Sequence, residues 1–181
     1  ISDIGGESPQ FAVAADLDGF GMAADGKRPG IRGFTGQLRA DRSGGRLEID
    51  APGMAVTYPK ILGRTAVLDE ASGTLIWRRG DNRTTLLSDS IVLRNADFSV
   101  ESNIEVNVAD ESRTPIVDLA ATWSVSDLAT IKGYIPELPT APNTRDWLER
   151  ALLGGRIPRG TARLYGPLDK FPFDGGEGRF A

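Results

Sequence analysis

The feature that most constrains this chain is an alternation of apolar and polar residues that runs from Phe98 to Val108. Side chains of an extended strand point alternately to opposite faces, so a period of two predicts a β-strand with one apolar face. These eleven residues would span about 36 Å when extended, which is longer than a usual strand. Ser102 is the one polar interruption of the apolar face, which otherwise carries Phe98, Val100, Ile104, Val106 and Val108.

Shorter runs with the same period occupy most of the first 125 residues. They cover residues 11–17, 34–40, 46–50, 54–58, 75–77 and 117–123. Several of them are separated by short segments rich in Gly, Asp, Asn and Pro, at 41–45, 51–53 and 80–82. Such residues favour tight turns. We therefore expect a mostly β chain in which neighbouring strands pair antiparallel as a meander.

Helix signals appear only late in the chain. Ser126 and Asp127 are suited to cap a short helix with Leu128, Ile131 and Tyr134 on one face. A second helix is expected to begin near Asn143, and Gly154 and Gly155 would end it. Its apolar stripe consists of Trp147, Leu148, Ala151 and Leu152. This stripe either anchors the helix against the sheet or belongs to a movable lid or docking element.

These patterns divide the chain, residues 1–181, into parts of a single segment of a longer protein. We expect a β meander over residues 1–125, a helical insert over 126–155, and a returning strand with a Gly-rich end over 156–181. The chain begins at Ile1 with no initiator Met and no signal peptide. We interpret it as an excised piece whose targeting signals lie elsewhere.

Composition argues against an enzyme and against a metal site. The chain has no His and no Cys, which removes the commonest general base and the commonest metal ligands. Gly21 to Lys27 fit the start of a phosphate-binding loop, but Arg28 stands where that motif needs Ser or Thr. We therefore predict no catalytic residues, no metal and no cofactor. A net charge of −4 also disfavours nucleic acid as a partner.

The apolar strand faces have two interpretations. They either close a sandwich core, or part of them lines an open groove for an apolar ligand. Alternation does not separate the two, because both keep one face away from water. In the second case an acyl chain would lie along the long strand that starts at Phe98.

The last third of the chain carries an ordered series of short motifs. Residues 134–136 read YIP, residues 147–157 read WLERALLGGRI, residues 164–168 read LYGPL and residues 171–180 read FPFDGGEGRF. Upstream, residues 29–36 read PGIRGFTG and residues 73–77 read GTLIW. This order resembles the central domain of the YhdP family, which is AsmA-like and related to TamB.

The resemblance implies a Gram-negative cell-envelope protein that is anchored in the inner membrane by parts outside this segment and extends through the periplasm. In that family a β-sheet curls into a long apolar groove that carries phospholipid toward the outer membrane. We therefore expect a long, curved, groove-like antiparallel sheet with one or two short helices packed on it. Phospholipid is the expected partner, and the five apolar residues of the long strand are the candidate lining. The alternative is a structural or protein-interaction β module with a closed core and no lipid.

If Trp147 anchors the second helix against the sheet, the substitution Trp147→Ala should lower the free energy of unfolding by about 3–5 kcal/mol. Denaturant unfolding of the chain measures this change. An unchanged midpoint would mean that the helix is loosely attached, and would favour the lid.

Overall fold

The computed structural model describes residues 11–25, 28–58, 62, 64–109, 114–134, 150, 153–170, 173 and 175–181. Within them the strands are β1 (Ala12–Met22), β2 (Gly30–Asp41), β3 (Gly44–Asp50), β4 (Ala55–Thr57), β5 (Ala66–Val67), β6 (Glu70–Arg79), β7 (Arg83–Arg94), β8 (Phe98–Ala109), β9 (Ile116–Val125), β10 (Ile157–Pro167) and β11 (Arg179–Phe180). The helical elements are α1 (Leu128–Ile131) and the 3-10 helices η1 (Lys132–Tyr134) and η2 (Leu168–Lys170).

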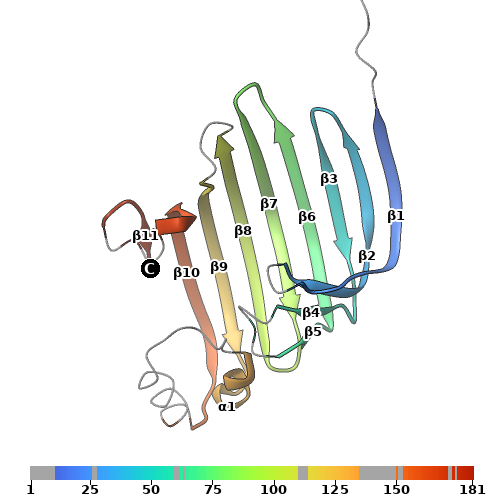
Figure 1. Cartoon of the computed structure of the whole chain (residues 1–181). Helices are drawn as coiled ribbons and strands as arrows, with labels where there is room; N and C mark the ends of the chain where they lie inside the picture. The colour runs from blue at the N-terminus through green and yellow to red at the C-terminus, as the bar shows by residue number, and fades with distance from the viewer. Residues whose placement is uncertain are drawn as a thin grey trace, which may run out of the picture.

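The described strands form one antiparallel sheet (Figure 1). Its order is β11-β10-β9-β8-β7-β6-β3-β2-β4-β5, and β1 pairs with β2. Strands that follow one another in the chain mostly pair in the sheet. The exception is at β4 and β5, which lie off the main path, so that β3 pairs directly with β6. The expected mostly β, antiparallel fold is therefore confirmed, with one excursion in the meander. The alternation did not reveal that excursion because β4 and β5 have only three and two residues.

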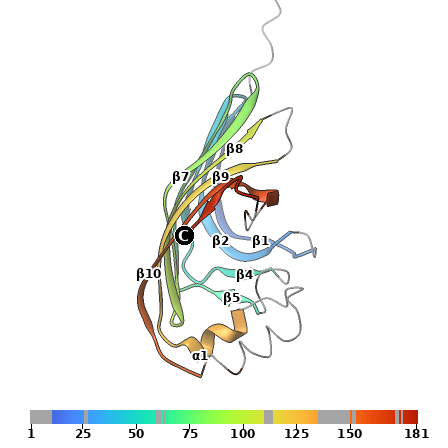
Figure 2. The same ribbon diagram turned by 90° about the vertical axis from the view of Figure 1, so that its left-hand side faces the viewer.

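The excursion is possible because β2 bends and changes partners. Its later half, from Gly36 to Ala40, pairs with β3, whereas its start, from Gly30 to Arg32, pairs with β4. Gly33 lies between the two stretches with φ +71°, in the left-handed region that glycine adopts most easily. Register shifts in the β1–β2 pairing fall at the same level. The lower part of this ribbon consequently turns over the face of the main sheet, where β4 and β5 lie (Figures 1 and 2).

The register places apolar residues in rows across one face of the sheet. Directly paired residues share a face, and one such row reads Leu38, Leu47, Leu75, Ser88, Ile104, Leu119 and Leu164. Figure 2 shows that the strands curve along their length, with β4, β5 and α1 on the concave side. The apolar rows occupy this concave face, because the core residues beneath β4 and β5 belong to it.

The buried core lies at the lower end of the concave face. Its members are Phe34, Ala51, Met54, Leu68 and Ala71. Leu68, which follows β5, is only 2% exposed. We call β4, β5 and the part of β2 paired with β4 the lower layer. This layer covers the bottom of the main sheet and buries apolar area, which is the main favourable contribution to its attachment.

α1 begins where the sequence predicts it. The Asp127 carboxylate accepts a hydrogen bond from the amide of Ala129 at 2.9 Å, and the hydroxyl of Thr130 donates to the backbone oxygen of Asp127 at 2.9 Å. The first of these bonds satisfies an amide that the start of a helix leaves without an intrahelical partner. The helix continues only as η1 and reaches Tyr134.

Two tryptophans of the concave face lie over glycines on the neighbouring strand. Trp77 on β6 is paired with Gly45 on β3, and Trp123 on β9 is paired with Gly160 on β10. A Cβ atom added to either glycine would overlap the facing indole ring. The missing side chain therefore makes room for each ring to lie against the sheet.

The contact between Trp123 and Gly160 gives a stability prediction. Gly160→Val should lower the free energy of unfolding by about 1–3 kcal/mol, because the added side chain overlaps the indole ring and forces it or the strand to move. Denaturant unfolding of the full chain measures the change.

Gly80→Ala is the matched control. A Cβ atom at Gly80 would meet only the backbone oxygen of Arg83, at an ordinary 3.5 Å, so its effect should stay below about 0.5 kcal/mol. Equal stability of the two variants would show that Trp123 does not need the glycine.

Candidate functional site

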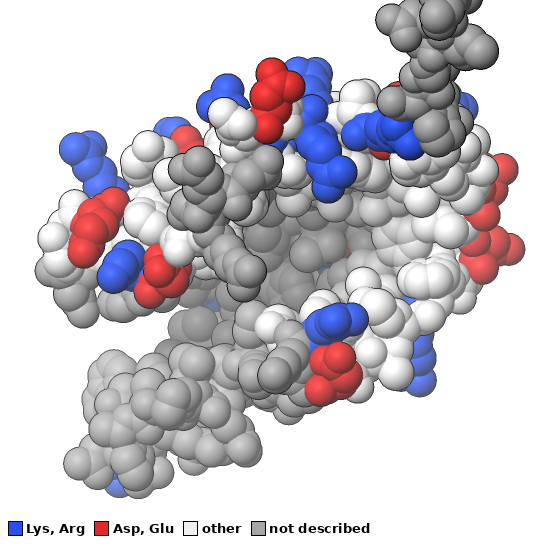
Figure 3. All heavy atoms as spheres, turned by 45° about the horizontal axis from the view of Figure 1, so that its top comes forward, with Lys and Arg blue, Asp and Glu red and all other residues white. Residues whose placement is uncertain are grey.

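The candidate site is a trough formed by the concave face above the lower layer. Figure 3 shows a hollow in the molecular surface, with charged side chains on its edge and on the outside of the protein. The candidate lining residues Phe98, Val100, Ile104, Val106 and Val108 all lie on β8 and are all half-buried. Their neighbours Glu101 and Glu105 are exposed on the opposite, convex face.

The described residues contain both arrangements that the sequence left open. Eight of the ten buried apolar residues lie at the lower end: Phe34, Ala51, Met54, Ala55, Ala66, Leu68, Ala71 and Val125, the last of which is paired with Phe98. On β6, Ala71 is 1% exposed, whereas the concave residues further along the strand are half-buried. The concave face is thus a closed core at the bottom, and above that level most of its apolar side chains keep partial access to solvent. Val117 on β9, which is paired with Val106, is an exception at 9% exposed.

The trough runs across the strands and not along them. Figure 2 shows that the strands curve along their length, so the concavity of the sheet extends in the direction in which strands succeed one another. Eight strands from β1 to β10 take part, and at about 4.8 Å per neighbouring pair they give a length of roughly 34 Å. The sequence alone suggested an acyl chain parallel to β8, but β8 crosses the trough. Phe98 stands at the closed end, where it packs against the core, and Val108 stands near the upper edge.

Two serines interrupt the apolar wall. Ser88 on β7 and Ser102 on β8 are 7% and 8% exposed. The hydroxyl of Ser88 has no hydrogen-bond partner among the described residues, and a buried hydroxyl without a partner is unfavourable. A shift of register in β7 between Ser88 and Ile91 turns Ser88 to the concave face. Simple alternation does not reveal this position, because the bulge breaks the period.

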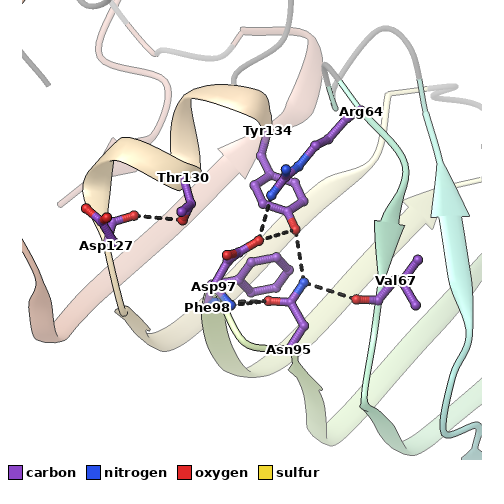
Figure 4. A network of polar contacts seen from close by, with 8 residues as sticks. All are labelled: Arg64, Val67, Asn95, Asp97, Phe98, Asp127, Thr130 and Tyr134. Carbon is purple, nitrogen blue, oxygen red and sulfur yellow. Dashed lines mark hydrogen bonds and ion pairs between the residues drawn. The ribbon is translucent and has the colours of Figure 1, made fainter. Parts of the chain in front are cut away.

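A polar network fastens the lower end of the trough (Figure 4). The Tyr134 hydroxyl donates to the Asp97 carboxylate at 2.8 Å, and the Arg64 guanidinium donates to the same oxygen at 2.6 Å. The guanidinium carbon of Arg64 lies 4.1 Å from the centre of the Tyr134 ring. The ring of Phe98 meets that ring edge-on, with 5.3 Å between centroids. A cation above a ring and an edge-to-face pair are both attractive arrangements.

Asn95 completes the network from the turn between β7 and β8. Its side-chain oxygen accepts hydrogen bonds from the amides of Asp97 and Phe98, at 2.9 and 3.0 Å. Its side-chain nitrogen donates to the Tyr134 hydroxyl and to the backbone oxygen of Val67, each at 3.1 Å. One side chain therefore ties β5, the β7–β8 turn and η1 together. Sequence patterns gave no sign of this role, because the three segments are far apart in the chain.

The structure tests only some of the other expectations from the sequence. The predicted helix anchors Trp147, Leu148, Ala151 and Leu152 lie outside the described residues. Within the described part of the chain, no group of three or more acidic residues is arranged to hold a metal ion. No helix there is long and apolar enough to cross a membrane.

Comparison with known proteins identifies a family. The family model described as YhdP protein matches residues 2–181. No curated protein and no solved structure matches the chain.

The lower network gives a second stability prediction. Tyr134→Phe keeps the ring contacts but removes the hydroxyl that joins Asp97 to Asn95, and should lower the free energy of unfolding by about 0.5–1.5 kcal/mol. Amide hydrogen exchange should also quicken at α1 and η1, since η1 loses its hydrogen bonds to the turn between β7 and β8.

Tyr165→Phe is the control, because Tyr165 is 56% exposed on the convex side of β10 and its loss of a hydroxyl should be neutral. If both variants had the same stability and the same exchange rates, the network would contribute nothing to closing the trough.

Proposed function

The chain belongs to the YhdP family, and on that premise we propose that it forms a section of an apolar channel for phospholipid. The family is a bacterial envelope family, and membership indicates a general role in lipid transport and the envelope. The proposal adds a place and a direction. The section lies in the periplasm, belongs to a protein anchored in the inner membrane, and serves phospholipid transport toward the outer membrane and envelope integrity.

One observation carries the proposal. Above the lower layer, an apolar face that two serines interrupt crosses eight strands and is largely half-buried, while most residues of the opposite face are polar. An antiparallel sheet ordinarily has one solvated face, and that face is polar. A second face that is both apolar and partly open favours an apolar ligand over a purely structural role.

The proposal assigns no catalytic step to this segment. The family is not known as enzymatic. The trough wall offers apolar side chains and two serines, and the chain has no histidine. A lipid in this trough would be held by burial of its acyl chains and would not be transformed. Each methylene group buried contributes about 0.8 kcal/mol.

The closed lower core favours a second candidate, a structural or protein-interaction module without a lipid ligand. The buried cluster around Leu68 is of the kind that such a module needs. Mass spectrometry of lipids extracted from the purified chain distinguishes the two functions. Co-purified phospholipid supports the channel, whereas a lipid-free monomer supports the module.

Photo-crosslinking tests the channel in cells. A photoreactive residue at Val106 in the full-length protein should capture phospholipid, because Val106 lies on the concave face above the lower layer. The same residue at Glu105, next in the chain but on the convex face, should capture little or none. Val100, which lies closer to the closed end, provides a second position on the trough wall.

The comparison of adjacent positions makes the result decisive. The two positions are adjacent on the same strand and differ in the face that they occupy. Equal capture from Val106 and Glu105, or no capture from Val106 and Val100, would contradict a lipid-filled trough.

A further inference from the structure

The middle of β7 contains an irregularity of the trough wall. Between Ser88 and Ile91, β7 advances by three residues where β6 and β8 each advance by two, so one extra residue forms a β-bulge. Gly73 on β6 faces this bulge with φ +139°, and a Cβ atom there would overlap the backbone oxygen of Ser90. The glycine therefore makes room for the bulge.

The bulge decides which side chain of β7 faces the trough. On one side of it, Ile91 and Leu93 belong to the concave face, because they pair with concave residues of β8. Unbroken alternation from Ile91 would place Asp89 on that face and Ser88 on the convex one. With the extra residue, Ser88 lies in the apolar wall and Asp89 is exposed. Bulges often re-aim a side chain beside a functional site, and this one places a neutral hydroxyl in the wall.

The Ser88 hydroxyl has apolar surroundings and no protein partner. Its direct neighbours across the sheet are Leu75 on β6 and Ile104 on β8. Ser88 is 7% exposed, and its side-chain oxygen accepts or donates no hydrogen bond among the described residues. Such a buried hydroxyl is unfavourable, and an apolar side chain of similar shape would be as stable or more stable there. Stability of the sheet therefore does not explain this serine.

Ser102 adds a second hydroxyl close by. It lies diagonally across from Ser88 on the concave face, since its direct partner on β7 is Ile91, and diagonal neighbours are about 7–8 Å apart. Ser102 is 8% exposed. The row that contains Ser88 is otherwise aliphatic, over β6, β3 and β2 in one direction and over β8, β9 and β10 in the other. The wall thus has a small polar spot with apolar surface on both sides.

This setting selects the kind of group that can bind there. A charged phosphate would lose its hydration in an apolar wall, which is very unfavourable, and a hydrocarbon chain has no hydrogen-bond acceptor for a serine. The ester carbonyl that joins an acyl chain to glycerol is neutral, accepts a hydrogen bond and stands where the hydrocarbon begins. Burial of this carbonyl is unfavourable without a donor, and a hydroxyl in the wall supplies one.

We propose that the Ser88 hydroxyl donates a hydrogen bond to the ester carbonyl oxygen of an acyl lipid whose chain lies along the trough. This inference rests on the proposed function and names the group of the lipid that the wall recognises. Rotation about the Cα–Cβ bond moves the hydroxyl between staggered positions. For Ser88 that rotation breaks no side-chain hydrogen bond to a described residue, so the hydroxyl can turn toward a ligand. The bond fixes the ester at the level of β7, beside Ser102.

Two single-chain lipids that differ in one group test the proposal. Both are lyso-phosphatidylcholines with chains of equal length, but one chain is joined by an ester and the other by an ether, which lacks the carbonyl. Isothermal titration of the full chain, below the concentrations at which the lipids form micelles, compares their affinities. The ester lipid should bind about 3- to 10-fold more tightly, as expected for one hydrogen bond in an apolar site.

Variants locate the preference. Ser88→Ala should weaken the ester lipid to the level of the ether lipid and leave the ether lipid unchanged. The matched control is Ser124→Ala, which removes a hydroxyl from the convex side of β9 and should keep the preference. Without lipid, the denaturation midpoint of Ser88→Ala should equal or exceed that of the unmodified chain, because no hydrogen bond is lost.

Each outcome decides one point. Equal affinity of the unmodified chain for both lipids overturns the ester site but leaves the channel standing, whereas binding of neither lipid overturns the channel and the site with it. A preference that survives Ser88→Ala, or equal weakening of both lipids with a lowered midpoint, overturns the role of Ser88. Loss of the preference in Ser124→Ala would show that the preference does not arise in the concave wall.

Discussion

The structure depends on how the apolar face of one antiparallel sheet is kept from water. Every main strand contributes apolar side chains to the same face, and exposed apolar area is unfavourable. Two devices deal with this constraint. The lower layer covers one end and produces the buried cluster around Leu68 and Ala71. Curvature along the strands brings the remaining side chains toward one another and leaves them half-buried.

Glycines shape this geometry because they have no side chain. Gly33 allows β2 to bend toward the lower layer. Gly45 and Gly160 leave the space in which Trp77 and Trp123 lie flat. The tryptophans thereby cover backbone that would otherwise be bare on the concave face, and the two large rings do not obstruct the trough. The same residue type thus serves both the bend and the lining.

Much of the main sheet follows from local patterns, and the lower end does not. The alternation from Phe98 to Val108 predicted β8 almost to the residue, since a face that must avoid water imposes a period of two. The N-cap of α1 at Asp127 was also predicted from the sequence. By contrast, Asn95, Asp97 and Tyr134 meet only through the tertiary fold. Arg64 is 33 residues from its partner Asp97, and no pattern within a short window reports such a contact. The trough direction escaped prediction for the same reason, because it is a property of strand order and curvature.

The orientation of the trough fixes how much chain it needs. Its length grows along the hydrogen bonds of the sheet, by about 4.8 Å for each added strand, and the main strands β6 to β10 have 10 to 12 residues each. Because neighbouring strands are antiparallel, removing one strand would reverse the direction of everything that follows it. A trough of this design therefore lengthens or shortens in whole hairpins, in steps of roughly 10 Å. Its reach is set by the number of hairpins that the gene encodes and not by the stretching of any linker.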